Sequence, residues 1–319
     1  MSTTPTTSDT KEYTHYTIVS GSNKGNSSFE GVSLILLNRG GKPFKSEFLS
    51  KLSELNLQEI ISVETSEHIF EMENMTKKLS RLKFLLVSKD ISVGERINIA
   101  VKEAAGTHAL VFWNDMNLQI KTQAERILKQ AVQGDFLCRV PILMNDRKET
   151  IPTRFAPGYS RKKLEVYSLA AVKNKIPTLY PYDYCAIYHR QSFILTGGYD
   201  PLIMNPYWQK LDFGFRAYLW GEKIETSTAL RINYIGDIPR EDTTRDYYYR
   251  RFFLKNMAPK FSGDCSTLPF SHFLSFVLQS GSSMYQAFKE YKQIKKWVEE
   301  NSLRFKTDPF NLTELWKME

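Results

Sequence analysis

Short apolar runs alternate with segments of helical spacing along the first part of the chain. The run VSLILL, from Val32 to Leu37, lies between Gly31 and the sequence Asn38-Arg39-Gly40-Gly41, which is typical of a buried parallel strand that ends in a loop. Apolar residues at helical spacing then predict a helix over 44–55. Further apolar runs predict strands at 60–63, 84–87 and 109–113, with helices at 97–105 and from 119 to about 133. This rhythm predicts a doubly wound α/β sheet.

The second half of the chain is less regular. Strands are predicted at 136–144, 184–188 and 229–235, whereas residues 145–180 show few clean periods and predict a long loop. From Arg245 onward the pattern favours helix to the end, with breaks near 262–264 and at Gly281. Residues 1–30 are rich in Ser and Thr, and we expect a disordered tail there.

Polar residues follow the predicted strands of the first half. Asn38, Arg39, Glu64, Asn114 and Asp115 all occupy strand ends. Because ligands of doubly wound sheets bind beyond the carboxyl ends of the strands, these residues are candidates for a binding site. The alternative is that the Asn-Asp pair only turns the chain, since both residues favour turns.

Residues 193–224 combine a glycine turn with an amphipathic helix. The turn reads GGYDP from Gly197 to Pro201, and apolar residues at helical spacing follow until Gly221. Asp212 lies near the start of this helix, where the helix dipole stabilises a carboxylate, and Arg216 lies one turn later. The segment therefore predicts either the floor of an active site or a surface ion pair worth under about 1 kcal/mol.

The order GGYD, spacer, YWxxLDFGFRAYLWG resembles the acceptor-side segment of family-2 glycosyltransferases, whose common form reads GGFD, spacer, W-E-D-x-D-x-x-x-R, spacer, G. The Glu-Asp pair of that form, whose Asp is the usual general base, falls on Gln209 and Lys210. Asp212 retains the later acid. The resemblance therefore implies Asp212 as the catalytic base.

A second segment, residues 92–116, resembles the same family. The family has a Gly, a basic residue and an Asn before a helix, then A-x-G, an apolar strand and D-x-D. Gly94, Arg96 and Asn98 match the first three positions, and the D-x-D is reduced to Asn114-Asp115. A guanidinium near a helix N-terminus can hold a pyrophosphate, and a strand-end carboxylate can hold Mg²⁺ or Mn²⁺.

The resemblance implies one GT-A-type domain over residues 31–256, with a mixed sheet flanked by helices, and a C-terminal helical extension over 257–319. It implies transfer of a sugar from a nucleotide-diphosphate donor to an acceptor hydroxyl with inversion, and a weak Mn²⁺ or Mg²⁺ site at Asp115. The implied nucleotide-sugar contacts are Asn38, Arg39, Glu64, Gly94, Arg96, Asn98 and Asn114. The implied acceptor-side residues are Gly198, Tyr199, Asp200, Trp208 and Arg216.

Composition narrows the setting of such an enzyme. The net charge of +8 favours anionic partners, but the basic residues are scattered, so nucleic acid is not expected. The three cysteines are far apart and in no metal spacing, which indicates a reducing compartment. No apolar run is long enough to span a bilayer and no secretory signal begins the chain. We expect a cytoplasmic protein, with peripheral contact at the inner face of a membrane, acting on a glycan, lipid-linked or protein acceptor.

Two other functions are compatible with the sequence. The changes at Gln209, Lys210 and Asn114, and the lack of a His in the late strand, also fit a degenerate glycosyltransferase that binds a glycan, a nucleotide sugar or a partner without turnover. A nucleotidyltransferase would need a glycine- and lysine-rich phosphate loop after the first strand. Gly40-Gly41-Lys42 resembles such a loop only weakly.

Overall fold

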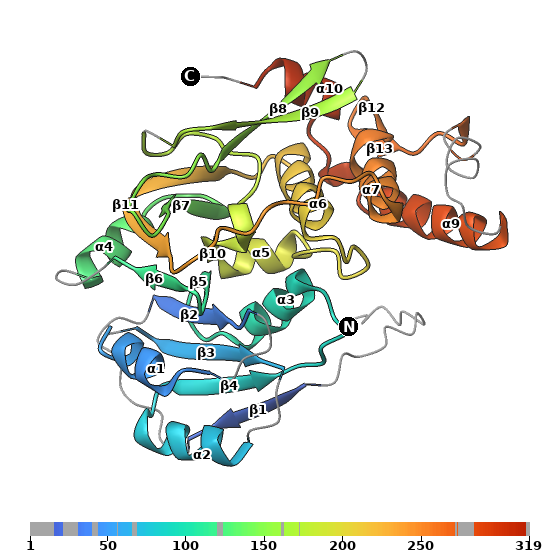
Figure 1. The fold of residues 1–319 in the computed structure, drawn as a ribbon. Helices are drawn as coiled ribbons and strands as arrows, with labels where there is room; N and C mark the ends of the chain where they lie inside the picture. Colours follow the sequence, from blue (N-terminus) through green and yellow to red (C-terminus); the bar gives the residue numbers. More distant parts are fainter. Residues whose placement is uncertain are drawn as a thin grey trace, which may run out of the picture.

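The computed structural model describes residues 16–21, 31–39, 44–55, 57–65, 69–119, 124–160, 163–171, 173–271, 273 and 284–316. Within these residues the main feature is a mixed nine-stranded sheet in the order β1-β4-β3-β2-β5-β10-β7-β11-β6, with helices packed around it (Figure 1). The predicted mixed α/β class is confirmed.

The first half of the sheet is a parallel unit. Strands β4, β3, β2 and β5 pair in parallel, so their carboxyl ends lie at one edge of the sheet. Every residue of β2 and β3 is buried, as expected for strands covered on both faces. The elements of this half are β2 (Val32–Leu37), α1 (Ser46–Ser53), β3 (Glu59–Glu64), α2 (Ile69–Lys78), β4 (Leu82–Leu86), α3 (Val93–Glu103) and β5 (His108–Trp113).

One strand of this half was not expected. Thr17–Ser20 form β1, an edge strand antiparallel to β4, and the Tyr16 hydroxyl donates to Glu103 at 2.6 Å. The prediction of a disordered tail over 1–30 is therefore wrong for residues 16–21. Its other residues lie outside the described part of the chain. The segment is too short and too mixed to show a pattern, and pairing with β4 supplies the backbone partners that it needs.

The second half of the sheet is mixed. Strand β10 is antiparallel to both β5 and β7, β11 runs parallel to β7, and β6 closes the edge. The elements here are β6 (Met116–Leu118), α4 (Ala124–Ala131), β7 (Cys138–Met144), the short 3₁₀ turn η1 (Tyr182–Tyr184), β10 (Ala186–His189), α5 (Arg190–Leu195), α6 (Pro206–Leu219) and β11 (Ile224–Tyr234).

Helix α6 has clear local reasons for its ends. The side chain of Asn205 accepts from the backbone N–H groups of Tyr207 and Trp208, and Pro206 occupies the first turn. Gly221 follows the helix with a φ of +85°, a conformation that glycine adopts at little cost. The predicted helix and its glycine stop are thus present.

Residues 145–180 are not the predicted long loop. Strands β8 (Arg154–Ser160) and β9 (Lys163–Leu169) form an antiparallel hairpin beside the main sheet (Figure 1). Phe155 of β8 is buried, and its ring stacks on Tyr180 with centroids 4.4 Å apart. The hairpin was missed because its stability depends on packing against residues far along the chain.

The C-terminal part is also less helical than predicted. Helix α7 (Tyr247–Phe252) runs directly into a π-helical turn, η2 (Phe253–Met257), so the expected boundary at residue 256 falls inside this turn. A small hairpin follows, β12 (Lys260–Ser262) with β13 (Cys265–Thr267). The remaining elements are α9 (Met284–Glu300), η3 (Ser302–Arg304) and α10 (Pro309–Glu314).

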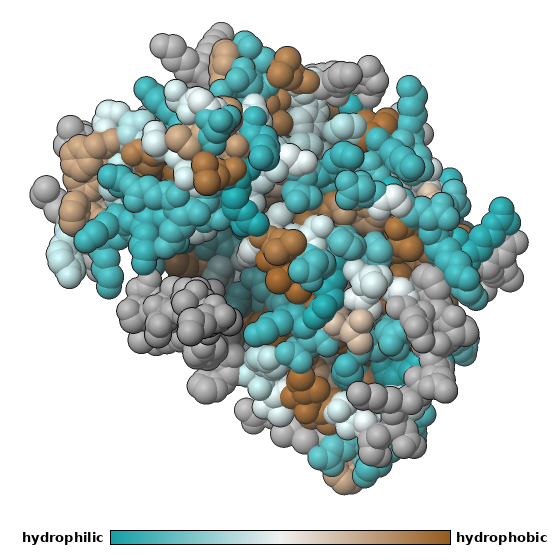
Figure 2. All heavy atoms as spheres, turned by 180° about the vertical axis from the view of Figure 1, so that it is seen from behind, coloured by the Kyte–Doolittle hydropathy of each residue, from teal (hydrophilic) through white to brown (hydrophobic). Residues whose placement is uncertain are grey.

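On one face of the molecule the apolar residues lie in separate patches. Figure 2 shows small brown groups surrounded by hydrophilic side chains on the face opposite to that of Figure 1. In the described part of the chain, no helix combines the length and the apolar character needed to cross a bilayer.

Candidate functional site

Polar residues from three strand ends meet at the carboxyl edge of the parallel unit. Asn38 donates to Glu64 at 2.6 Å, Asn114 donates to Asn38 at 2.8 Å, and the backbone N–H of Arg39 donates to Asn114 at 3.1 Å. The Arg39 side chain continues the chain of contacts to Asp115. The structure therefore brings together the five strand-end residues that the sequence singled out.

A residue that sequence reasoning missed completes this group. Asp183 lies in η1 with a φ of +51°, and its carboxylate pairs with the Arg39 guanidinium at 2.5 Å. The Tyr234 hydroxyl donates to the same carboxylate at 3.0 Å, and the Trp113 indole N–H donates to the Asp183 carbonyl at 2.8 Å. We call Asn38, Arg39, Asn114, Asp115 and Asp183 the strand-edge cluster. The only local signal for Asp183 was an acid between tyrosines.

Accessibility divides these residues. The side chains of Arg39 and Asp115 are 29% and 28% exposed, so both can meet a ligand. Glu64 is buried, and its two oxygens accept from Asn38 and Ser62. Burial raises the pKa of Glu64, against the opposing effect of those two hydrogen bonds. Glu64 thus supports Asn38 from behind and offers no exposed oxygen.

Lys210 lies beside this cluster, at the position where the resemblance placed a catalytic carboxylate. It is buried and forms an ion pair with Glu241 at 2.5 Å. Its ammonium lies over the rings of three tyrosines, Tyr180, Tyr182 and Tyr184, at 5.3 to 5.6 Å from their centroids. The Tyr180 hydroxyl also donates to Glu241, at 2.8 Å. The segment after β11 therefore carries a carboxylate back to the start of α6.

The GGYD turn and α6 form a second, buried group. Asp200 accepts from Arg251 at 2.8 Å and from Lys255 at 2.7 Å. Asp212 pairs with Lys255 and Arg216, both at 3.1 Å. Asn256 donates to Asp212 Oδ1, the oxygen that also pairs with Lys255, at 2.8 Å. We call Asp200, Asp212, Arg216, Arg251, Lys255 and Asn256 the buried turn–helix network.

Asp212 is fully enclosed in that network. Its side chain has 0% exposure and both of its oxygens accept hydrogen bonds. An acceptor hydroxyl cannot reach either oxygen in this arrangement. The prediction that Asp212 is the catalytic base does not fit its position, and neither does a surface ion pair with Arg216. The helical spacing was right, but α7 and η2 cover the face on which both residues lie.

The three residues of α3 that resembled a pyrophosphate site each bond a different part of the protein. Asn98 donates to the Tyr199 carbonyl at 2.8 Å and accepts from the Tyr199 N–H at 2.9 Å. The Gly94 N–H donates to Gln209 at 2.9 Å. Arg96 donates to the Lys89 carbonyl at 3.1 Å, and burial lowers its pKa. In this arrangement Asn98 holds the turn against α3, and Gly94 joins α3 to α6.

The other residues that the resemblance assigned to the acceptor side also contact other parts of the protein. A Cβ at Gly198 would lie 2.3 Å from the Asn98 side-chain oxygen, and Gly198 has a φ of +61°. Trp208 is buried and donates its indole N–H to the Thr244 carbonyl at 2.7 Å. Arg216 donates to the carbonyls of Thr196 and Gly198. These contacts join the turn, α6 and the segment after β11 into one unit.

The carboxylates of the strand-edge cluster do not form a metal site as placed. Among the described residues, no group of three or more His, Cys, Asp or Glu side chains could hold a metal ion. Asp115 has one oxygen on Arg39, and its other oxygen is shielded from solvent without a hydrogen-bond partner. One such oxygen is a poor basis for Mg²⁺ or Mn²⁺, which favour about six ligands in near-octahedral geometry.

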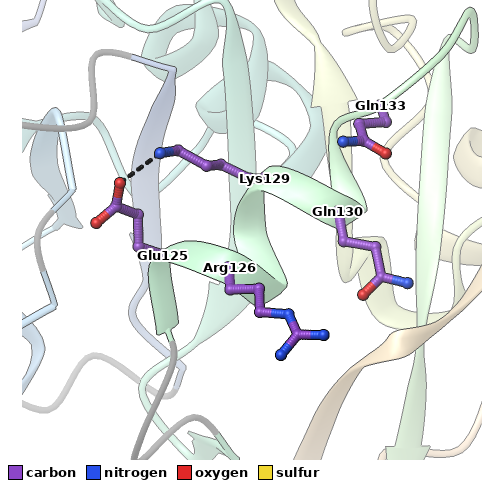
Figure 3. A pocket seen from close by; sticks show the side chains of 5 residues that line it. All are labelled: Glu125, Arg126, Lys129, Gln130 and Gln133. Carbon is purple, nitrogen blue, oxygen red and sulfur yellow. Dashed lines mark hydrogen bonds and ion pairs between the residues drawn. The ribbon is translucent and has the colours of Figure 1, made fainter.

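An open hollow of about 690 Å³ lies elsewhere, along the polar face of α4 (Figure 3). Glu125, Arg126, Lys129, Gln130 and Gln133 line it, and Lys129 pairs with Glu125 at 2.5 Å. All five come from α4 and the two residues that follow it. None belongs to the strand-edge cluster, so the hollow is not the site that the strand ends form.

The chain is similar to known proteins in its fold and not in its sequence. No protein-family model and no curated protein sequence matches the chain. The crystal structure of GalNAc-T7 with UDP, GalNAc and Mn²⁺ is similar, with a TM-score of 0.53 and 12% identity over 92% of this chain and 59% of that one. The chain has a GT-A fold. It spans about 59% of the GalNAc-T7 chain.

Two further glycosyltransferase structures are similar to this GT-A chain at a lower level. S. aureus TarS 1-349 in complex with UDP-GlcNAc gives a TM-score of 0.48 and 11% identity over 83% of this chain and 71% of that one. The mannosyltransferase PcManGT from Pyrobaculum calidifontis, in complex with GDP-Man and Mn²⁺, gives 0.44 and 10% over 84% and 71%.

Proposed function

We propose that this GT-A protein binds a nucleoside-diphosphate sugar at the strand-edge cluster and transfers the sugar to an acceptor hydroxyl with inversion. The observation that carries the proposal is the meeting of Asn38, Arg39, Asn114 and Asp115 at the carboxyl edge of four parallel strands, with Arg39 and Asp115 partly exposed. Ligands of open α/β sheets bind at this edge. The structural similarity to GalNAc-T7, which was crystallised with UDP, supports a nucleoside diphosphate as the ligand.

The side chains at this edge suit the nucleoside and the diphosphate of such a donor. Amide groups of Asn38 and Asn114 are hydrogen-bonding partners for a base or ribose, and the Arg39 guanidinium is a donor to phosphate oxygens. Tyr182 contributes an aromatic face near Lys210. The acceptor in this proposal is a hydroxyl of a glycan, a lipid-linked sugar or a protein.

Transfer with inversion also needs a base that can take the proton of the acceptor hydroxyl, and we propose a carboxylate for this role. We assign Asp212 a positioning role because it has no exposed oxygen. The acidic residues near the cluster whose side chains are partly exposed are Asp115, Asp183 and Glu241, at 28%, 11% and 15%. We place the base among these three residues.

A second function is favoured by a specific observation. The Gln209 side chain accepts from the Gly94 N–H and donates to the Ser92 hydroxyl and the Asp200 carbonyl. Lys210 forms an ion pair with Glu241. Family-2 glycosyltransferases carry acids at these two positions, whereas here both side chains make contacts within the protein. This favours a protein that binds a nucleotide sugar or glycan without turnover.

The test of nucleotide binding is thermal unfolding with a panel of nucleoside diphosphates. We expect UDP or GDP at millimolar concentration to raise the melting temperature, since a ligand of the native state adds RT ln(1 + [L]/Kd) to stability. Asn114→Ala should reduce the shift, whereas Asn117→Ala, on the exposed side of β6, should leave it unchanged. The absence of a shift with every nucleotide would refute the site.

Turnover is tested separately by incubating nucleotide sugars with the protein and measuring release of nucleoside diphosphate, with and without a panel of hydroxyl acceptors. Release above the buffer rate supports the transferase. A protein that binds nucleotide but releases none from any donor supports the binding protein.

A further inference from the structure

The Arg39 guanidinium lies in a place that is built for a cation. Its Nε donates to Asp115 and its Nη2 donates to Asp183, both at 2.5 Å. The guanidinium carbon lies 4.0 Å from the centroid of the Trp113 ring. A flat cation held between two carboxylates and an aromatic face has little freedom to move.

The surrounding residues hold Asp183 in this position. Asp183 has a φ of +51°, which is costly for a residue other than glycine. Trp113 donates to its carbonyl and Tyr234 donates to its carboxylate, at 2.8 and 3.0 Å. The same tryptophan thus orients the aspartate and supports the arginine that the aspartate binds. This is more organisation than a chance surface ion pair needs.

A divalent ion at these carboxylates would compete with Arg39 for the same oxygens. The Asp115 oxygen that is in contact accepts from Nε, and the two Asp183 oxygens face Nη1 and Nη2, at 3.5 and 2.5 Å. No third acid, His or Cys in the described ranges joins them to make a metal-binding group. The Arg39 guanidinium therefore already occupies the place between the two carboxylates that a metal ion would need.

We propose that Arg39 is the resident cation of the Asp115–Asp183 pair and takes the place of a divalent metal, so that nucleoside diphosphate binds here without Mg²⁺ or Mn²⁺. The nucleotide part rests on the proposed function. The exclusion of metal stands on the ion pairs alone. The partly exposed guanidinium remains able to donate to phosphate oxygens, because among the described residues its Nη1 contacts only Asp183, at the long distance of 3.5 Å.

The first experiment titrates MnCl₂ alone into the full chain and follows binding by the loss of free Mn²⁺ signal in electron paramagnetic resonance. Wild type should bind no Mn²⁺ at sub-millimolar concentration. Arg39→Gln should bind Mn²⁺ roughly tenfold more tightly than wild type, since two carboxylates then lack a counter-ion. The double variant Arg39→Gln/Asp115→Asn should lose that gain.

Arg190→Gln is the matched control, because its guanidinium donates only to the carbonyls of Val101 and Lys102 in the described contacts. It should behave as wild type. The proposal is overturned if wild type binds Mn²⁺ at sub-millimolar concentration and Asp115→Asn abolishes that binding. This comparison does not need Arg39→Gln, so it tests the proposal even if that variant does not fold.

The second experiment titrates UDP and GDP calorimetrically into wild type, once with EDTA and once with Mn²⁺. Equal affinity in the two buffers supports Arg39 as the working cation. Binding seen only with Mn²⁺ overturns the proposal but leaves the nucleotide site standing. If neither nucleotide binds in either buffer, the proposed function fails, and with it the nucleotide part of this proposal. The MnCl₂ titration then still decides whether Arg39 excludes the metal.

Discussion

Asp212 shows how much the role of one carboxylate depends on its surroundings. Near the start of an exposed helix it would be available for proton transfer. Here it contacts Arg216, Lys255 and Asn256, and its side chain is fully buried. Removing one member of a buried ion pair leaves its partner as an uncompensated charge in the interior, which lowers the stability of the fold.

We expect Asp212→Asn to lower the free energy of unfolding by about 3 kcal/mol, because Arg216 and Lys255 lose a negative partner in the interior. Chemical denaturation measures this loss. Asp264→Asn, in the exposed turn between β12 and β13, is the control and should be close to neutral. Unchanged stability together with a turnover reduced about a hundredfold would instead restore Asp212 as the base.

Asp200 in the same network predicts a pH dependence of stability. Burial by itself raises the pKa of Asp200, but the charges of Lys255 and Arg251, which donate to it, hold the pKa well below its ordinary value. A carboxyl group whose pKa is lower in the folded state contributes stability above its unfolded pKa, about 3.9, and loses it as the pH falls toward the folded pKa.

Wild type should therefore be more stable than Asp200→Asn by about 3 kcal/mol near neutral pH. The difference should be constant between about pH 5 and pH 7 and should shrink below about pH 4. Urea denaturation of both proteins across this range measures it. A difference that grew on acidification would contradict the lowered pKa.

At the scale of elements, the glycines of α3 and α6 decide how closely helices approach their neighbours. A Cβ at Gly94 would lie 2.4 Å from the Tyr199 Cβ, and one at Gly214 would lie 2.0 Å from the Leu179 carbonyl oxygen. These contacts are with backbone or with the root of a side chain, which cannot move aside easily. Close approach lets α3 hold the GGYD turn through Asn98.

Gly94→Ala tests this packing. Alanine normally stabilises a helix interior by about 0.5–1 kcal/mol relative to glycine, but overpacking here should outweigh that gain and cost about 1–3 kcal/mol. Thermal unfolding measures the sign. Lys102→Ala, on the exposed side of the same helix, should change stability little. A stabilised Gly94→Ala variant would show that α3 and the turn can separate without cost.

At the scale of the whole molecule, strand β1 protects one edge of the nine-stranded sheet. It covers β4 along Thr17–Ser20, and Tyr16 anchors it to α3 through Glu103. An uncovered edge strand offers unpaired backbone groups to other chains. The sequence alone predicted a disordered tail over residues 1–30, whereas the pairing of β1 predicts that removal of these residues lowers stability.

A chain that begins at Tyr16 keeps β1, and one that begins at Gly31 lacks it. We expect the second to melt at a lower temperature and to associate more at high concentration, because β4 becomes an exposed edge. Thermal unfolding and light scattering compare the two. Equal melting temperatures and equal monomer content would show that β1 contributes nothing to the sheet.

The sequence by itself determined the class of the fold, most strands and helices of residues 32–144, the helix of residues 206–219 and the strand-end position of Asn38, Arg39, Asn114 and Asp115. These features depend on hydrophobic period, helix caps and turn residues, all of which act over a few neighbouring positions. The motif order around Gly198 and Asp212 resembles that of family-2 glycosyltransferases, and this resemblance implied the GT-A fold.

Only the tertiary structure decided what those residues contact. Arg39 meets Asp183 across 144 positions, and Asp212 meets Asn256 across 44. Whether a polar residue on a helix faces water or a buried cation depends on which later segment packs against it. The pattern of neighbouring residues does not predict that segment. The β8–β9 hairpin and β1 were missed for the same physical reason, because their stability comes from distant partners and not from their own sequence.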